Sequence, residues 1–107
     1  MNFFAVRQVR EFVDSLEGPV QADVKRLMIL LEKNGQLSMP YAKPIGRGLW
    51  ELRRTGRPQI RILYGFCHGY VVLVYALQKQ RRSLGEKEVH LARGRLVAYC
   101  ADIARML

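Results

Sequence analysis

Apolar residues in the first third of the chain recur at the three- and four-residue spacing of one helical face. The first run comprises Val6, Val9, Val13 and Leu16, and the second comprises Val20, Val24, Leu27 and Leu31. Between the runs, Glu17-Gly18-Pro19 interrupts the pattern, and Pro19 suits the first position of a new helix. Asn34-Gly35 is a typical helix end. Because so few residues separate the two helices, the pattern predicts an antiparallel helical hairpin.

The middle of the chain changes to the two-residue alternation of β-strands. Three strands are predicted, at residues 49–54, 60–66 and 70–78, whereas residues 36–48 contain prolines and glycines and predict a connecting loop. Residues 85–106 return to helical spacing. The sequence therefore predicts one α+β domain over residues 1–107. An N-terminal helical hairpin packs on a small antiparallel three-to-four-stranded sheet, with a C-terminal helix.

Composition adds a strong charge to this outline. The chain has 107 residues, half of them hydrophobic, and a net charge of +9. Thirteen of its 18 basic residues are Arg. Arg offers a fixed fork of donors that matches phosphate, stays charged and stacks on bases. This bias favours a nucleic-acid or other acidic partner, with a generally basic surface as the alternative.

Cysteines and histidines predict neither a metal site nor a disulfide framework. Cys67 and Cys100 lack metal-ligand spacing, which predicts free thiols in a reducing compartment. His68 and His90 lie far apart and are predicted at the surface. Neither a signal peptide nor an apolar run of roughly 18 residues is visible. We expect a cytoplasmic protein that needs no metal or cofactor and does not enter a membrane.

The predicted strands contain cations where buried strands are normally apolar. Arg53, Arg61 and Lys79 lie near strand centres or ends, which predicts one part of one face that is open to an anion. Glu51 is the single acid in this region, and it is expected to pair with Arg53 rather than act as a base. Such cations suit RNA cleavage by the substrate's own 2′-hydroxyl, where the enzyme orients the groups and stabilises the charge on phosphorus. Strand tyrosines such as Tyr64 either stack on bases or fill the core.

The order of these segments resembles the RelE/HigB superfamily of toxins, and most of all its phage-derived, host-killing (Gp49-like) branch. The segments are LWELR at 49–53, IRILY at 60–64, VLVYALQK at 72–79 and EKEVHLA at 86–92, together with the helical hairpin. The resemblance covers nearly the whole chain. It implies the toxin of a type II toxin–antitoxin pair, a metal-independent endoribonuclease that cuts messenger RNA in the ribosomal A site. It also implies a cognate antitoxin, commonly a helix-turn-helix protein, through which the complex contacts operator DNA.

Site residues follow from the same resemblance. Arg53 matches the arginine that closes the family's "ELR" strand, Arg61 the arginine of its "YR" strand, and Lys79 the first lysine after the third strand. These three are expected to bind the scissile phosphate. Tyr75 stands where the family often has His and is a candidate proton relay, so the acid–base roles stay open. Gln80 replaces the second of the family's paired lysines.

Five further arginines are candidate RNA-binding residues. They are Arg47, Arg54, Arg57, Arg81 and Arg82. The last two follow Lys79-Gln80 and are candidates to replace the lost lysine charge. Two alternatives accompany the nuclease interpretation. One is a catalytically degenerate module that binds RNA or an antitoxin, and the other is an interaction protein whose charge meets an acidic partner.

Overall fold

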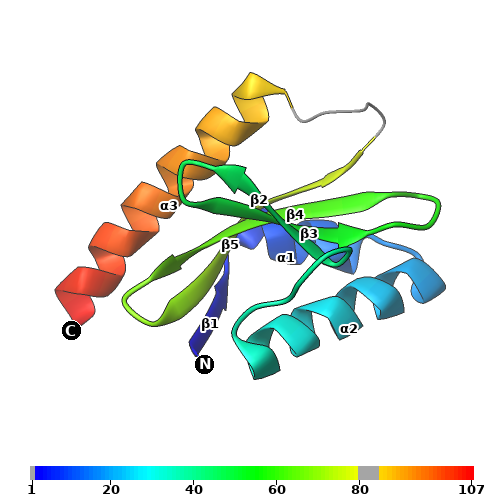
Figure 1. Cartoon of the computed structure of the whole chain (residues 1–107), viewed down its shortest axis with the longest axis horizontal. Helices are drawn as coiled ribbons and strands as arrows, with labels where there is room; N and C mark the ends of the chain where they lie inside the picture. Colours follow the sequence, from blue (N-terminus) through cyan, green and yellow to red (C-terminus); the bar gives the residue numbers. More distant parts are fainter. Residues whose placement is uncertain (1, 80–84) are drawn as a thin grey trace.

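A computed structural model describes residues 2–79 and 85–107 of the chain. Five strands and three helices follow one another as β1, α1, α2, β2, β3, β4, β5 and α3 (Figure 1). The helices are α1 (Arg7–Asp14), α2 (Gly18–Asn34) and α3 (Glu86–Met106). The strands are β1 (Asn2–Ala5), β2 (Ala42–Gly46), β3 (Leu49–Arg54), β4 (Ile60–Cys67) and β5 (Tyr70–Gln78). The α+β class, the helical hairpin and the C-terminal helix are confirmed.

The sheet has the order β1-β5-β4-β3-β2 and is antiparallel except at one edge, where β1 runs parallel to β5. The strands predicted at 49–54 and 70–78 have those bounds, and β4 runs one residue further than predicted, to Cys67. His68 and Gly69 then turn the chain with φ values of 48° and 81°. Two consecutive positive φ values are typical of the tight hairpin turn whose twist matches the flanking strands.

Helices cover both faces of this sheet, which is why β5 is apolar on both sides. The hairpin α1–α2 packs on one face through the predicted stripe, in which Val9, Val13, Val24 and Leu31 are buried. Helix α3 packs on the other face against β4 and β5. A side chain at Gly65 would place its Cβ 2.5 Å from Leu96 of α3, so the glycine permits this close approach.

Two strands lie outside the three that the sequence predicts. β2 occupies part of the expected loop at 36–48, because Pro44 masks the strand pattern. Proline is tolerated here since β2 forms an edge of the sheet and needs to pair on only one side. β1 has only four residues, and its parallel pairing with β5 joins segments nearly 70 positions apart. No local pattern indicates such a pairing.

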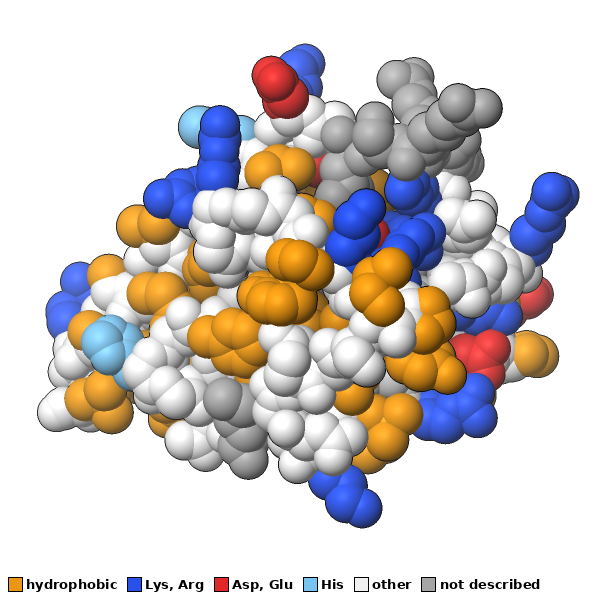
Figure 2. Space-filling model, viewed as in Figure 1, with side chains coloured by type: hydrophobic (Ala, Val, Ile, Leu, Met, Phe, Trp, Pro, Cys, Tyr) orange, Lys and Arg blue, Asp and Glu red, His pale blue; other side chains and the backbone are white. Residues whose placement is uncertain are grey.

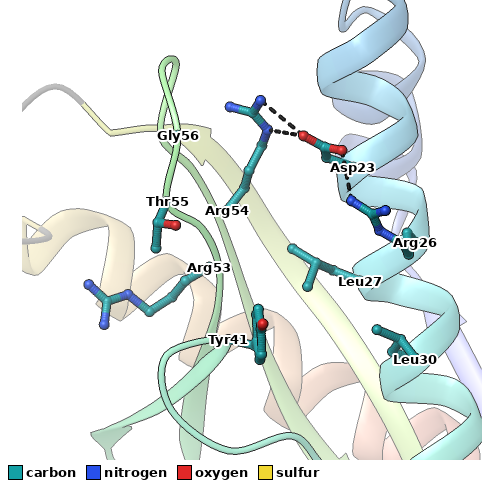
Figure 3. A pocket seen from close by; sticks show the side chains of 9 residues that line it. All are labelled: Asp23, Arg26, Leu27, Leu30, Tyr41, Arg53, Arg54, Thr55 and Gly56. Carbon is teal, nitrogen blue, oxygen red and sulfur yellow. Dashed lines mark hydrogen bonds and ion pairs between the residues drawn. The ribbon is translucent and has the colours of Figure 1, made fainter.

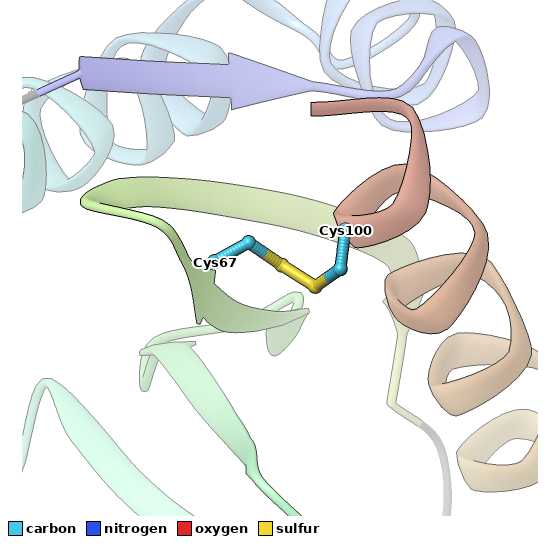
Figure 4. Close-up of a disulfide and its surroundings, with 2 residues drawn as sticks. All are labelled: Cys67 and Cys100. Carbon is cyan, nitrogen blue, oxygen red and sulfur yellow. A yellow bond between two sulfur atoms is a disulfide. The ribbon is translucent and has the colours of Figure 1, made fainter. Parts of the chain in front are cut away.

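The prediction of free thiols was wrong. Cys67 at the end of β4 and Cys100 in α3 form a disulfide that fastens the helix to the sheet (Figure 4). The two residues are separated by 33 positions, and their Cα atoms are 5.3 Å apart. This proximity arises only when α3 folds back over β4, so spacing along the chain could not reveal it.

Helices long and apolar enough to cross a bilayer do not occur in residues 2–79 or 85–107.

The disulfide should contribute measurably to stability. Closing a loop between residues 33 positions apart reduces the entropy of the unfolded chain, and typical contributions are about 2–4 kcal/mol. We expect the double substitution Cys67→Ala/Cys100→Ala to lower the free energy of unfolding by this amount in urea titrations without reductant. With reductant present, wild type and variant should nearly converge. Equal stability of the two proteins without reductant would contradict a formed disulfide.

Candidate functional site

Strand register places the cations of the sheet side by side on the face that carries α3. Arg53 of β3 is directly opposite Arg61 of β4, and Lys43 of β2 is directly opposite Glu51 of β3. Side chains of directly opposed residues share a face of the sheet. Figure 2 shows Lys and Arg side chains gathered over these strands beside hydrophobic ones.

One carboxylate is shared by two guanidinium groups at the centre of this cluster. Glu51 Oε1 lies 3.3 Å from Arg53 Nε and 3.4 Å from Arg61 Nε. The Glu51 side chain is only 5% exposed and that of Arg53 is 20% exposed. Both Nε atoms are buried and lack a hydrogen bond within the described residues, so the pairing is electrostatic rather than well-aligned. The predicted ion pair of Glu51 with Arg53 is present.

Arg61 is held beneath the surface by the backbone around it. Its side chain is 2% exposed. Nη1 donates to the carbonyls of Arg54 and Ile60 at 3.1 and 3.2 Å, and Nη2 donates to Gln59 Oε1 at 3.0 Å. Burial lowers the pKa of the Arg61 guanidinium, Glu51 raises it and Arg53 lowers it. Arg61 therefore orients Glu51 and the β3–β4 backbone, whereas Arg53 reaches the surface.

Lys79 joins the cluster immediately after β5. Its backbone N–H donates to the carbonyl of Gln59 at 2.9 Å, which continues the β4–β5 ladder by one residue. Partial burial lowers the pKa of the Lys79 ammonium. Glu51 raises this pKa, and Arg61, Arg53 and Lys43 lower it. Lys79 thus lies within the field of every other member of the cluster, and its proton is held less tightly than that of an isolated lysine.

Tyr75 lies on the same face of the sheet, on β5, which is two strands away from Glu51 on β3. It is opposite Leu63, which is itself opposite Glu51, and two strand spacings amount to about 10 Å. The guanidinium carbon of Arg95 lies 5.3 Å from the centre of the Tyr75 ring. Arg95 Nη1 also donates to the carbonyl of Val74, the residue that the β4–β5 register skips. Arg95 therefore connects α3 to β5 and fixes the ring beside it.

The other candidate arginines do not join this cluster. Arg54 points to the opposite face of β3, where it pairs with Asp23 of α2 at 3.0 Å and donates to the Pro58 carbonyl at 2.7 Å. Figure 3 shows Arg53 and Arg54 on opposite sides of their strand. Arg57 is exposed in the β3–β4 loop. Arg81 and Arg82 lie outside the described residues.

Arg47 borders a hollow between the β2–β3 turn and the first turns of α3. It is exposed and has a φ of 57°, and its carbonyl accepts a hydrogen bond from Arg93. The hollow has a volume of about 500 Å³. It is lined by Ile45, Arg47, Glu86, Lys87, Val89 and His90. His90 and His68 are both exposed, as predicted.

Lys43 and Gln59 belong to the site but were not predicted from the sequence. Lys43 lay in the expected loop, and only strand β2 places it opposite Glu51. Gln59 precedes β4 and carries no charge, yet it holds Arg61. Residues 42–46 gave no alternating signal for the first, because Lys43 and the apolar Ile45 are two positions apart and share one face of a regular strand. Nothing in the sequence pointed to the second.

The cluster carries more positive than negative charge. Four cations, Lys43, Arg53, Arg61 and Lys79, surround a single carboxylate, so the field on this face is positive. Groups of three or more residues suited to hold a metal ion do not occur within the described part of the chain. Preorganised guanidinium and ammonium groups stabilise negative charge that develops on phosphorus without a metal.

Comparison with known proteins identifies one family. The model of "Phage derived protein Gp49-like (DUF891)" matches residues 11–97, which include every strand of the cluster. No curated protein matches the chain.

Glu51 should be essential for stability because it balances buried charge. Glu51→Gln keeps the shape of the side chain but leaves Arg61 and Arg53 without their counter-ion. Removal of one partner of a buried pair typically costs about 3–5 kcal/mol. We expect the free energy of unfolding to fall by an amount near the lower end of this range, because Arg53 can still reach water. Urea unfolding followed by Trp50 fluorescence measures this change. The matched control is Glu32→Gln on the exposed side of α2, which should change stability by less than about 0.5 kcal/mol. Similar stabilities of the two variants would refute the shared ion pair.

Proposed function

We propose a function whose premise is that the chain belongs to the phage derived Gp49-like family, a family of RelE/HigB-like toxins. In this proposal the chain is the toxin of a type II toxin–antitoxin pair. It cuts messenger RNA in a ribosome-dependent, metal-independent reaction and so inhibits translation in the cytoplasm. Its antitoxin is a helix-turn-helix protein through which the complex reaches operator DNA.

The observation that carries the proposal is the excess of cations around Glu51. Arg53 lies at the edge of the cluster with its side chain partly exposed, so it can contact a non-bridging phosphate oxygen. Arg61 is buried and acts as a positioning residue, because its nitrogens are directed to backbone, Gln59 and Glu51. The field of the cluster favours the extra negative charge of a phosphorane over the ground-state diester.

The reaction itself uses the substrate as nucleophile. The 2′-oxygen forms a bond to phosphorus, the bond from phosphorus to the 5′-oxygen breaks, and a cyclic phosphate and a 5′-hydroxyl result. The 2′-hydroxyl releases its proton to water, and Lys79 supplies a proton to the departing 5′-oxygen. A lysine whose pKa is lowered is a better proton donor than an exposed one. Tyr75, fixed by Arg95, offers a face for a base.

Other parts of the same face can position RNA. The hollow beside the β2–β3 turn adds Arg47 and Lys87, which suit backbone phosphates. Arg57 extends the positive surface at the opposite end of β3. Contacts of this kind set affinity and register rather than cleavage.

A second candidate function is a module that binds RNA or antitoxin without cutting. Tyr75 favours it, because this position often carries His in the resembling toxins and tyrosine is a weaker acid–base group at neutral pH. The two candidates differ in whether RNA ends are produced.

Growth arrest tests the nuclease proposal directly. Induced wild type should stop growth and protein synthesis in bacteria that lack the partner gene, and Arg53→Ala should abolish the arrest. The matched control is Arg105→Ala, which removes an exposed arginine at the far end of α3. Circular dichroism should show all three proteins folded. No arrest by folded wild type, or equal arrest by Arg53→Ala, would sink this proposal.

The pH profile of cleavage tests the role of Lys79. With purified ribosomes programmed with messenger RNA and with EDTA present, the rate should fall as pH rises through the pKa of Lys79. Only the protonated amine donates, and burial lowers this pKa, so the fall should begin below the usual lysine value of about 10.4. Lys79→Arg keeps the charge but cannot release a proton in this range. Its slower reaction should lack the alkaline fall, and a fall of the same shape in both proteins would exclude Lys79 as the donor.

A further inference from the structure

The groove between α2 and β3 lies mainly on the face of the sheet opposite the cationic cluster. Arg53 of that cluster borders the groove from β3, although its side chain extends away from α2 (Figure 3). The groove is lined by Asp23, Arg26, Leu27, Leu30, Tyr41, Arg53, Arg54, Thr55 and Gly56 (Figure 3). Its volume is about 290 Å³. Small-molecule sites usually have at least about 300 Å³, so this groove suits one or two side chains of a larger partner better than a whole ligand.

Apolar groups form the floor and rim of the groove. Leu27 is 9% exposed and lies deepest, whereas Leu30 is 38% exposed and Tyr41 is 52% exposed. In Figure 3 Leu27 and Leu30 extend from α2 toward the strand side, and Tyr41 faces them from the segment that precedes β2. A leucine and a tyrosine at this exposure leave an apolar surface that an inserted side chain can cover.

The charge around the groove is net positive, as it is in the cationic cluster. Arg26 and Arg54 both pair with Asp23, at 2.9 and 3.0 Å. Within residues 2–79 and 85–107, Asp23 is the one carboxylate that pairs with these two arginines. Arg26 is 71% exposed in its side chain and can turn to a new partner. The rim therefore complements an additional carboxylate beside the apolar anchor.

We propose that this groove is the docking site for an acidic amphipathic helix of the protein that neutralises the toxin. The inference rests on the proposed function. An apolar side chain of that helix enters between Leu30 and Tyr41, and a neighbouring Asp or Glu pairs with Arg26. Helices in grooves are recognised in this way, with anchors at helical spacing.

The combination of basic and apolar side chains in the groove favours a protein ligand over RNA. A phosphate backbone would use the guanidinium groups but gains nothing from Leu27 and Leu30. The net charge of +9 on the toxin adds long-range attraction for an acidic partner. The groove is bordered by β3, and Arg53 is the neighbour of Arg54 on that strand. A helix seated in the groove therefore lies beside the candidate phosphate-binding arginine. It can neutralise the toxin by excluding messenger RNA from that edge.

A displayed library of helical peptides, selected on the full-length immobilised chain, tests the proposal. We expect the enriched peptides to combine an apolar residue with Asp or Glu three or four positions away. Anisotropy titrations with the labelled peptide should show at least tenfold weaker binding to Leu30→Glu. The matched control is Leu91→Glu on α3, since Leu91 is 43% exposed and receives the same new charge outside the groove. This control should bind like wild type.

Several outcomes would overturn the inference. They are no enrichment, enrichment of basic peptides, or equal binding to Leu30→Glu and wild type. Displacement of the peptide by a uridine oligonucleotide, with equal loss of oligonucleotide binding in Leu30→Glu, would assign the groove to nucleic acid instead.

Co-expression extends the test to neutralisation. The enriched peptide should relieve growth arrest caused by wild type and by Leu91→Glu, but not arrest caused by Leu30→Glu. Relief of all three would also count against the groove. If wild type causes no arrest, the nuclease proposal fails by itself, while the binding titrations still decide whether the groove takes an acidic helix.

Discussion

The shared ion pair at Glu51 is the constraint on which the cationic cluster depends. One buried carboxylate lies within 3.4 Å of the Nε atoms of both Arg53 and Arg61. Two guanidinium groups so close together would repel each other without it. Backbone carbonyls and Gln59 accept hydrogen bonds from the two Nη atoms of the deeper Arg61, whereas Arg53 reaches the surface with an incompletely balanced charge. The single carboxylate does not balance the cations around it, so the net charge of this cluster is positive.

The layered fold makes this face available. A sheet with helices on both sides would normally bury every strand centre, and here α3 covers β4 and β5 at the end where the disulfide joins Cys67 to Cys100 (Figure 4). The opposite end of the same face carries Arg53, Arg61 and Lys79. The position of α3 thus separates an apolar half, which stabilises the fold, from a charged half that is suited to an anionic ligand.

The alternation of β3 explains how two different surfaces share one strand. Arg53 and Arg54 are neighbours in sequence, but successive strand residues point to opposite faces. One arginine pairs with Glu51 in the cationic cluster, and the other pairs with Asp23 at the α2 groove. The proposed RNA site and the proposed helix-docking groove therefore rely on different arginine–carboxylate pairs, while the common strand keeps the two surfaces adjacent.

The sequence by itself determined the helices, the three central strands and the identity of Arg53, Arg61 and Lys79 as unusual strand cations, because these depend on local periodicity and on residue type. It could not supply β1, the β2 position of Lys43, the supporting Gln59 or the disulfide, since each depends on a partner far along the chain. It also placed Arg54 with the RNA-binding residues, although the structure turns this side chain to α2. Which cations converge on Glu51 and which one remains accessible was decided only by strand register and burial, because interactions at 3–4 Å depend on where distant segments meet.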